Sequence, residues 1–234
     1  MLAKKRDELE KVVQILKELN HDDLSEKERY QLEATKLREL IKVSRIALDL
    51  KEAEILKLQD AQLIQDEKDE ERFIKQKMGL LKDLHQKYEQ LVASPEDIGL
   101  RDEIFQEENK LNQLELALKR LQVNVLQKRI DGAKAKKAAE SLRVLQEGEK
   151  REVQELETLT ALTDEIHSLT ARMDDAWTDP ATLKQLRGQL EELHRRSLAL
   201  QLTIKRQNIS NLAHRLAAHH LAQADPKHQH HHAH

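Results

Sequence analysis

The sequence predicts an all-α protein, specifically an elongated antiparallel coiled-coil hairpin with a three- to four-helix bundle at one end. Composition is the first reason: 35% of the 234 residues are charged, 2% are aromatic, and the chain holds only five glycines and three prolines. Such a composition is typical of long solvated helices. The second reason is periodicity, because leucine-type residues recur at steps of three and four, the spacing of a coiled-coil seam. A clear run of this kind is Leu159, Leu162, Ile166, Leu169 and Met173.

The periodic segments define one elongated helical domain over residues 1–222. Ser25 followed by Glu28 has the pattern of a capping box and marks the start of the second helix. Ser94 and Pro95 are expected to be the N-cap and the first position of the third helix. The four helices are expected at about residues 2–20, 26–93, 95–176 and 180–222, followed by a flexible His-rich tail over 223–234.

The short segment 94–98 allows two interpretations, a hairpin tip or a kink in one continuous rod, and its helix-breaking residues favour the tip. The preceding helix changes character along its length. Residues 37–64 carry apolar side chains around much of the helix, which requires partners on several sides, whereas 74–91 carry a single thin seam. We therefore expect a bundle around 37–64 and a bare two-helix stalk around 74–91.

Several functional classes are disfavoured by what the sequence lacks. With no cysteine, the chain has no disulfide, thiolate catalysis or thiolate metal site, and this composition fits a cytoplasmic protein. The net charge of −3 does not indicate binding to nucleic acid. No apolar run approaches the length of a transmembrane helix. No phosphate-binding loop, zinc-protease motif or nucleophile motif is present, so the chain is expected not to be an enzyme.

Histidines are concentrated at the end of the chain. Imidazoles at this density bind zinc or nickel, so the tail is a candidate for weak metal binding. No other cofactor is expected. The alternative interpretation is a flexible terminus or a purification tag, because a structural metal site needs a fixed scaffold. The candidate metal ligands are His228, His230, His231, His232 and His234.

A basic segment and an acidic segment are expected to face each other across the hairpin. The basic residues are Lys128, Arg129, Lys134, Lys136 and Lys137, and the acidic run is Asp66, Glu67, Asp69, Glu70 and Glu71. Pairing within the chain is preferred over binding of an external phosphate or acidic partner, and each exposed pair contributes little stability.

The sequence favours a non-enzymatic coiled-coil scaffold or adaptor that mediates protein–protein interaction within a larger assembly. Uncovered apolar surface on such a chain marks an interface. The partner, or a second copy of the chain, is predicted to dock on Ile55, Leu56, Leu63 and Ile64, where neighbouring helices are expected to give little cover. The alternative is a membrane-associated or pore-forming helical-hairpin protein of the bacterial effector or toxin type.

Overall fold

The computed structural model describes residues 1–176 and 179–224, and every regular element within them is an α-helix, which confirms the all-α prediction. The helices are α1 (Leu2–Leu19), α2 (Glu26–Lys57), α3 (Ala61–Ala93), α4 (Ile98–Gly132), α5 (Lys136–Asp175) and α6 (Pro180–Ala224).

Two of the expected long helices are each divided into two. The expected helix 26–93 ends at Lys57, Leu58 has extended backbone with φ −81° and ψ 143°, and a new helix starts after Asp60. The Asp60 carboxylate caps that helix by accepting hydrogen bonds from the backbone N–H of Gln62 at 2.8 Å and of Leu63 at 3.2 Å. The expected helix 95–176 is divided in the same way at 133–135, directly after a glycine that ends α4.

The capping residues are partly as predicted. Ser25 forms the expected capping box, in which its hydroxyl accepts from the N–H of Glu28 at 3.1 Å and the Glu28 carboxylate accepts from the N–H of Ser25 at 3.3 Å. The prediction that Ser94 caps the third helix is wrong. Asp97 caps α4 instead, accepting from the N–H of Leu100 at 3.0 Å, because a carboxylate near a helix N-terminus also meets the favourable end of the dipole.

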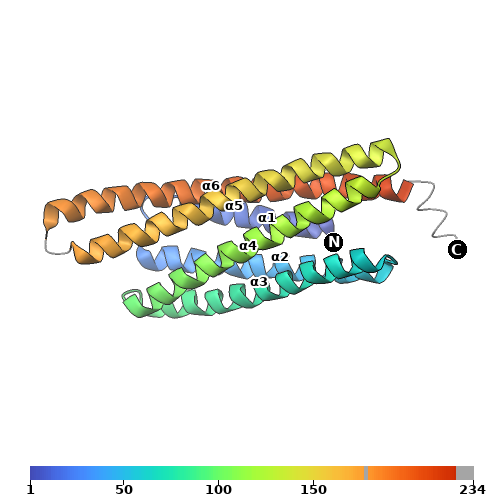
Figure 1. The fold of residues 1–234 in the computed structure, drawn as a ribbon. Coiled ribbons are helices and arrows are strands. Elements are labelled where there is room, and N and C mark those ends of the chain that lie inside the picture. The colour runs from blue at the N-terminus through green and yellow to red at the C-terminus, as the bar shows by residue number, and fades with distance from the viewer. Residues whose placement is uncertain (177–178, 225–234) are drawn as a thin grey trace.

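The six helices form a closed ring. Each one packs against the next in the chain, and α1 also packs against α6. Other pairs of helices within the described residues meet through side chains alone, such as Lys36 of α2 with Gln201 of α6 and Arg101 of α4 with Glu26 of α2. In Figure 1 the α2–α3 pair lies at the bottom and the α5–α6 pair at the top, with α4 in front of α1 between them. The ring therefore encloses an interior that side chains from all six helices have to fill.

One half of that interior is apolar, and it overturns the expected two-helix stalk. Leu81 and Leu84 of α3, Val12 of α1 and Leu37 of α2 are at most 3% exposed and belong to one core cluster with Ile104 of α4. The cause is the break at 58–60, which folds α2 back along α3. The thin seam of α3 is consequently packed inside a bundle of several helices rather than in a bare hairpin.

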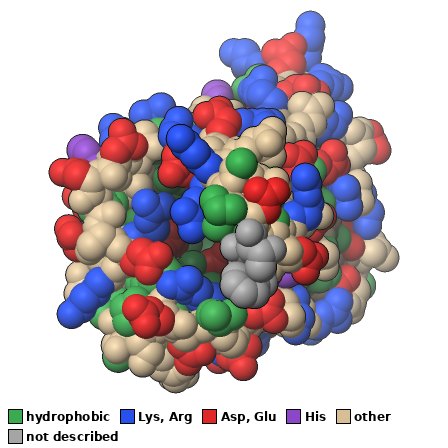
Figure 2. All heavy atoms as spheres, turned by 90° about the vertical axis from the view of Figure 1, so that its left-hand side faces the viewer, with side chains coloured by type: hydrophobic (Ala, Val, Ile, Leu, Met, Phe, Trp, Pro, Cys, Tyr) green, Lys and Arg blue, Asp and Glu red, His purple; other side chains and the backbone are tan. Residues whose placement is uncertain are grey.

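The part of the molecule that does project as two helices is the hairpin of α5 and α6, which extends past the other four helices at the left of Figure 1. Its seam is the periodic run found in the sequence, because Leu159, Leu162, Ile166 and Leu169 are all buried. Figure 2 views the molecule from this end, where acidic and basic side chains surround a hollow between the helices.

A carboxylate in the apolar half makes stability depend on pH. Glu108 accepts a hydrogen bond from the Tyr88 hydroxyl. Burial first, and repulsion by Glu33 second, raise the pKa of Glu108 from 4.5 to about 7. When folding raises the pKa of an acid, the folded state binds its proton more tightly, so the free energy of unfolding falls as that proton is lost. For Glu108 this loss of stability occurs as the pH rises from about 4.5 through about 7.

In the wild type, the free energy of unfolding is expected to be lower at about pH 8 than at about pH 5. We predict that Glu108→Gln reduces this difference by about 1–3 kcal/mol, and that at about pH 8 the variant is more stable than the wild type. Urea denaturation at both pH values measures this. The control is Glu103→Gln, an exposed glutamate on the same helix, which leaves the pH dependence as it is. Equal pH dependence in Glu108→Gln and the wild type would contradict the buried placement of this carboxyl.

Candidate binding sites at one end of the ring

The predicted docking residues lie at the turn between α2 and α3. Leu56 is 87% exposed, which makes it the most exposed large apolar side chain in the part of the chain that the structure describes. Ile55, Leu63 and Ile64 are only partly buried, and so is Leu58 in the turn itself. We call these five residues the turn patch. The wide apolar stripe of α2 is buried at Leu37, Leu40, Val43 and Ile46 but is left without full cover at the turn patch.

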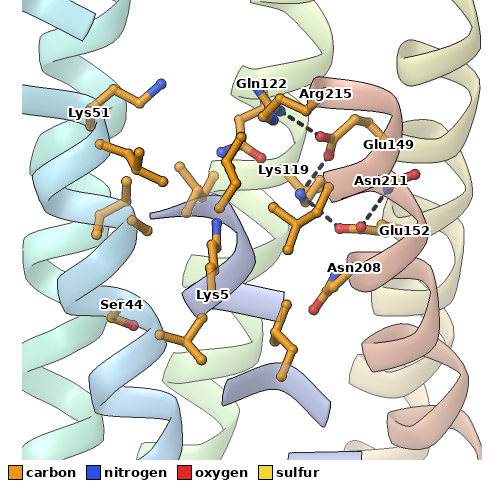
Figure 3. A pocket seen from close by; sticks show the side chains of 18 of the residues that line it. Lys5, Ser44, Lys51, Lys119, Gln122, Glu149, Glu152, Asn208, Asn211 and Arg215 are labelled. Carbon is orange, nitrogen blue, oxygen red and sulfur yellow. Dashed lines mark hydrogen bonds and ion pairs between the residues drawn. The ribbon is translucent and has the colours of Figure 1, made fainter. Parts of the chain in front are cut away.

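A cavity of about 320 Å³ occupies the half of the ring next to the turn patch. All six helices contribute to its wall, from Leu2 and Lys5 of α1 to Arg215 of α6, and Figure 3 shows side chains from several of them converging on one space. The wall contains both apolar and charged side chains. The cavity is therefore the charged counterpart of the apolar core that fills the other half of the ring.

Glu149 of α5 is a deeply buried charge in the cavity wall, since it is 2% exposed. Its carboxylate is 2.5 Å from the Lys119 ammonium of α4 and 2.8 Å from the Arg215 guanidinium of α6, so it joins three helices (Figure 3). Glu152, one turn further along α5, lies 2.8 Å from Lys119 and accepts a hydrogen bond from Asn211 of α6 at 2.6 Å.

These pairs hold their members in the charged form. The pKa of Glu149 falls from 4.5 to about 2, because attraction to Lys119 and then Arg215 outweighs the opposing effect of its burial, which is the largest single contribution. The pKa values of Lys119 and Arg215 rise for the reciprocal reason, again against burial. Removing one partner of such a buried ion pair strongly destabilises the protein, because the other charge then stays buried without a partner.

A second network lies across the cavity between α2, α3 and α4. The Lys51 ammonium of α2 is paired with Glu67 and, at 2.8 Å, with Glu70 of α3. Arg129 of α4 lies 2.5 Å from the other Glu67 oxygen, and its neighbour Lys128 is 2.9 Å from Asp66. The expected pairing between the basic and acidic segments is therefore present for Lys128 and Arg129, while Lys134, Lys136 and Lys137 make no ion pair in the described structure.

The candidate metal ligands His228, His230, His231, His232 and His234 lie outside the described residues, as does the expected tail from 225 onward. Within residues 1–176 and 179–224, no group of histidine and acidic side chains has the arrangement of a metal site. The same residues include no helix long and apolar enough to cross a membrane. Comparison with protein-family models, curated proteins and solved structures found no match for the chain.

The cavity residues were not identified from the sequence, although one signal for them is present. Glu149 and Glu152 continue the apolar face of α5, since they fall at steps of four and three between Leu145 and Leu156. A carboxylate at a core position of a heptad pattern requires a buried partner. The sequence does not say which helix supplies that partner, because this depends on the two unpredicted helix breaks.

Gly148 of α5 lies where Asn211 of α6 packs closely against the helix backbone. A Cβ atom at this position would lie 2.0 Å from Asn211 Oδ1, whereas nothing lies within 4 Å of a Cβ added at Gly79 or Gly188. An alanine at a helical glycine normally stabilises by about 0.5–1 kcal/mol. At Gly148 it would displace the buried amide that donates to Glu152.

We therefore predict that Gly148→Ala destabilises the protein by about 1–3 kcal/mol, whereas Gly79→Ala and Gly188→Ala stabilise it slightly. Thermal or urea unfolding of the three variants measures the contrast. If Gly148→Ala is as stabilising as the two controls, α6 does not approach α5 at this position.

Proposed function

We propose that this chain is a non-enzymatic helical scaffold that self-associates, with the turn patch as the interface between two copies. The observation that carries the proposal is the exposure of Leu56, at 87%, within a group of five apolar residues of which none is fully buried. An apolar cluster that the folded monomer leaves uncovered gains stability when a partner removes it from water.

A second copy suits this surface because the charges around it are of both signs. Glu52 and Lys57 are exposed on either side of Leu56, on the same helix. In a two-fold dimer each residue meets its counterpart reciprocally, so the acidic residue of one copy can face the basic residue of the other. A net charge of −3 on 234 residues adds little repulsion between copies.

The competing surface is the α3–α4 turn at the opposite end of the ring. Ile98 there is 76% exposed, but it stands beside Asp97 and Glu96 rather than in an apolar group. This tip is also the segment through which a membrane-associated hairpin would act, and its polar sequence supports that alternative less well. Ile98 is consequently a matched control, since it is an exposed apolar residue in a similar position at the wrong end.

We expect the wild-type chain to form a dimer, and Leu56→Lys to weaken it by at least about tenfold in dissociation constant, because a charge would be buried at the centre of the interface. Sedimentation velocity over a range of protein concentrations measures the association. Circular dichroism confirms that the variant keeps its helices, as expected for a side chain in solvent.

Ile98→Lys is expected to dimerise like the wild type. Loss of the dimer in Ile98→Lys with its retention in Leu56→Lys would move the interface to the tip. A wild-type chain that stays monomeric at millimolar concentration would overturn the proposal, because the patch would then be too small to hold two copies together.

A further inference from the structure

The cavity wall has more basic than acidic side chains. Four glutamates line it, namely Glu54, Glu115, Glu149 and Glu152. Seven basic residues line it, namely Lys5, Lys51, Lys57, Lys77, Lys119, Lys205 and Arg215. The carboxylates are already engaged, since Glu115 lies 3.5 Å from Lys77, Glu54 lies 3.2 Å from Lys51, and the other two are paired as described above. Positive charge is therefore left over inside the ring.

The surplus is located at Lys5 and Lys205. Neither ammonium has a carboxylate within ion-pair distance among the described residues, and the side-chain contact of Lys205 is a long one, 3.5 Å to the Asn208 amide oxygen. Both side chains are partly buried. In Figure 3, Lys5 extends from α1 into the middle of the cavity, with its nitrogen directed towards the space between Lys51 and Lys119. An unpaired ammonium in this position is a site for a negative charge.

The surroundings of Lys5 disfavour its own proton. Burial is the main cause, and the charges of Arg215, Lys119 and Lys77 are the next, with only Glu149 acting in the opposite direction; the pKa of Lys5 falls from 10.5 to about 7. The pKa of Lys205 falls to about 8, chiefly through burial, with repulsion from Lys77 and Lys36 opposed by Glu115 and Glu152. From α2, the Lys51 and Glu54 pair also faces this space.

The rest of the wall is suited to hydrocarbon. Its apolar members include Leu2, Leu9, Val43, Leu50, Leu118 and Leu212. A volume of about 320 Å³ corresponds to about ten water molecules at about 30 Å³ each, or about twice the size of an engineered cavity that takes up benzene. This space can hold an organic molecule with an apolar body of six to ten carbons, by order of magnitude, but not a nucleotide or a folded segment.

The cavity reaches the surface near the end of α2 and the C-terminal part of α6, because Lys57 and His219 both line it and are both exposed. α1 packs against both of these helices, and the hydrogen bond that joins them, from Lys36 to Gln201 at 3.4 Å, lies towards the apolar half of the ring. The N-terminal half of α1 packs beside Val43 of α2 through Leu9, with Leu2 against the same cluster.

We propose that the cavity is a binding site for a small organic monoanion, an aliphatic carboxylate whose head group is held at Lys5 and whose chain lies against the leucines of the wall. A single charge is favoured over a phosphate group, because the other cations around Lys5 are already paired with carboxylates and Lys5 itself offers one charge. The head-group site at Lys5 of α1 is distinct from the turn patch of α2 and α3, although Lys57 lines the cavity and also flanks that patch.

The test uses octanoate as the probe with the full-length chain at about pH 7.5, followed by isothermal titration calorimetry. Octanoate is expected to bind at least about tenfold more tightly than octan-1-ol, which has the same chain and no charge. Because the anion restores the proton to Lys5, binding is expected to take up protons, so that the measured enthalpy changes with the ionisation enthalpy of the buffer. At about pH 6 Lys5 already carries its proton, and this dependence disappears.

The variants compare two adjacent lysines. Lys5→Met keeps the length of the side chain and removes its charge, and it is expected to weaken octanoate binding by at least about tenfold and to abolish the proton uptake, with stability unchanged or raised. Lys4→Met, on the exposed side of α1, is expected to bind like the wild type. Equal affinity for octanoate and octanol, unchanged binding in Lys5→Met, or no octanoate binding at millimolar concentration would each overturn the proposal.

Discussion

The ion pairs of Glu149 with Lys119 and Arg215 hold three helices around an interior that hydrocarbon fills only in part. Six helices whose backbones approach only those of their neighbours leave a wider centre than a four-helix bundle, so this space has to be filled by long side chains or left open. In the half with the α3–α4 turn, leucines fill it. In the other half, lysine, arginine and glutamate side chains reach inward from the helices, and a cavity remains.

Burying charges in this way is costly, and the geometry shows how the cost is offset. Each carboxylate removed from water needs more than one partner to recover its hydration energy. Glu149 has two cations, Glu152 has a cation and the Asn211 amide, and Glu67 has Lys51 and Arg129. The cations outnumber these acceptors, so Lys5 is left in a position that the fold alone does not explain. A residue that departs from an otherwise consistent design is where a binding role is expected.

Local rules predicted the helices but not the ring. Periodicity and composition predict an all-α chain, and Ser25 with Glu28 predicts the start of α2 correctly. The break after Lys57 was missed because Leu58, Gln59 and Asp60 include neither glycine nor proline, and an Asp N-cap inside a charged helix resembles any other surface aspartate. Gly132 was a visible signal, yet a single glycine also occurs in the middle of helices, as Gly148 does here. Because these two breaks were not predicted, four helices were predicted as two long ones. The cavity was not predicted either, since its residues come together only when the chain turns at both breaks.

The pairing of Glu149 with Arg215 can be tested most directly by a double-mutant cycle between Glu149→Gln and Arg215→Met, with the free energy of unfolding measured in urea. These residues are 66 positions apart in the sequence and belong to different helices. The ring predicts that each single change costs about 3–5 kcal/mol and that the double variant is more stable than the sum of the two by at least about 1 kcal/mol. Additive effects, within about 0.5 kcal/mol, would show that the two side chains do not meet and would contradict the charged interior on which the fold depends.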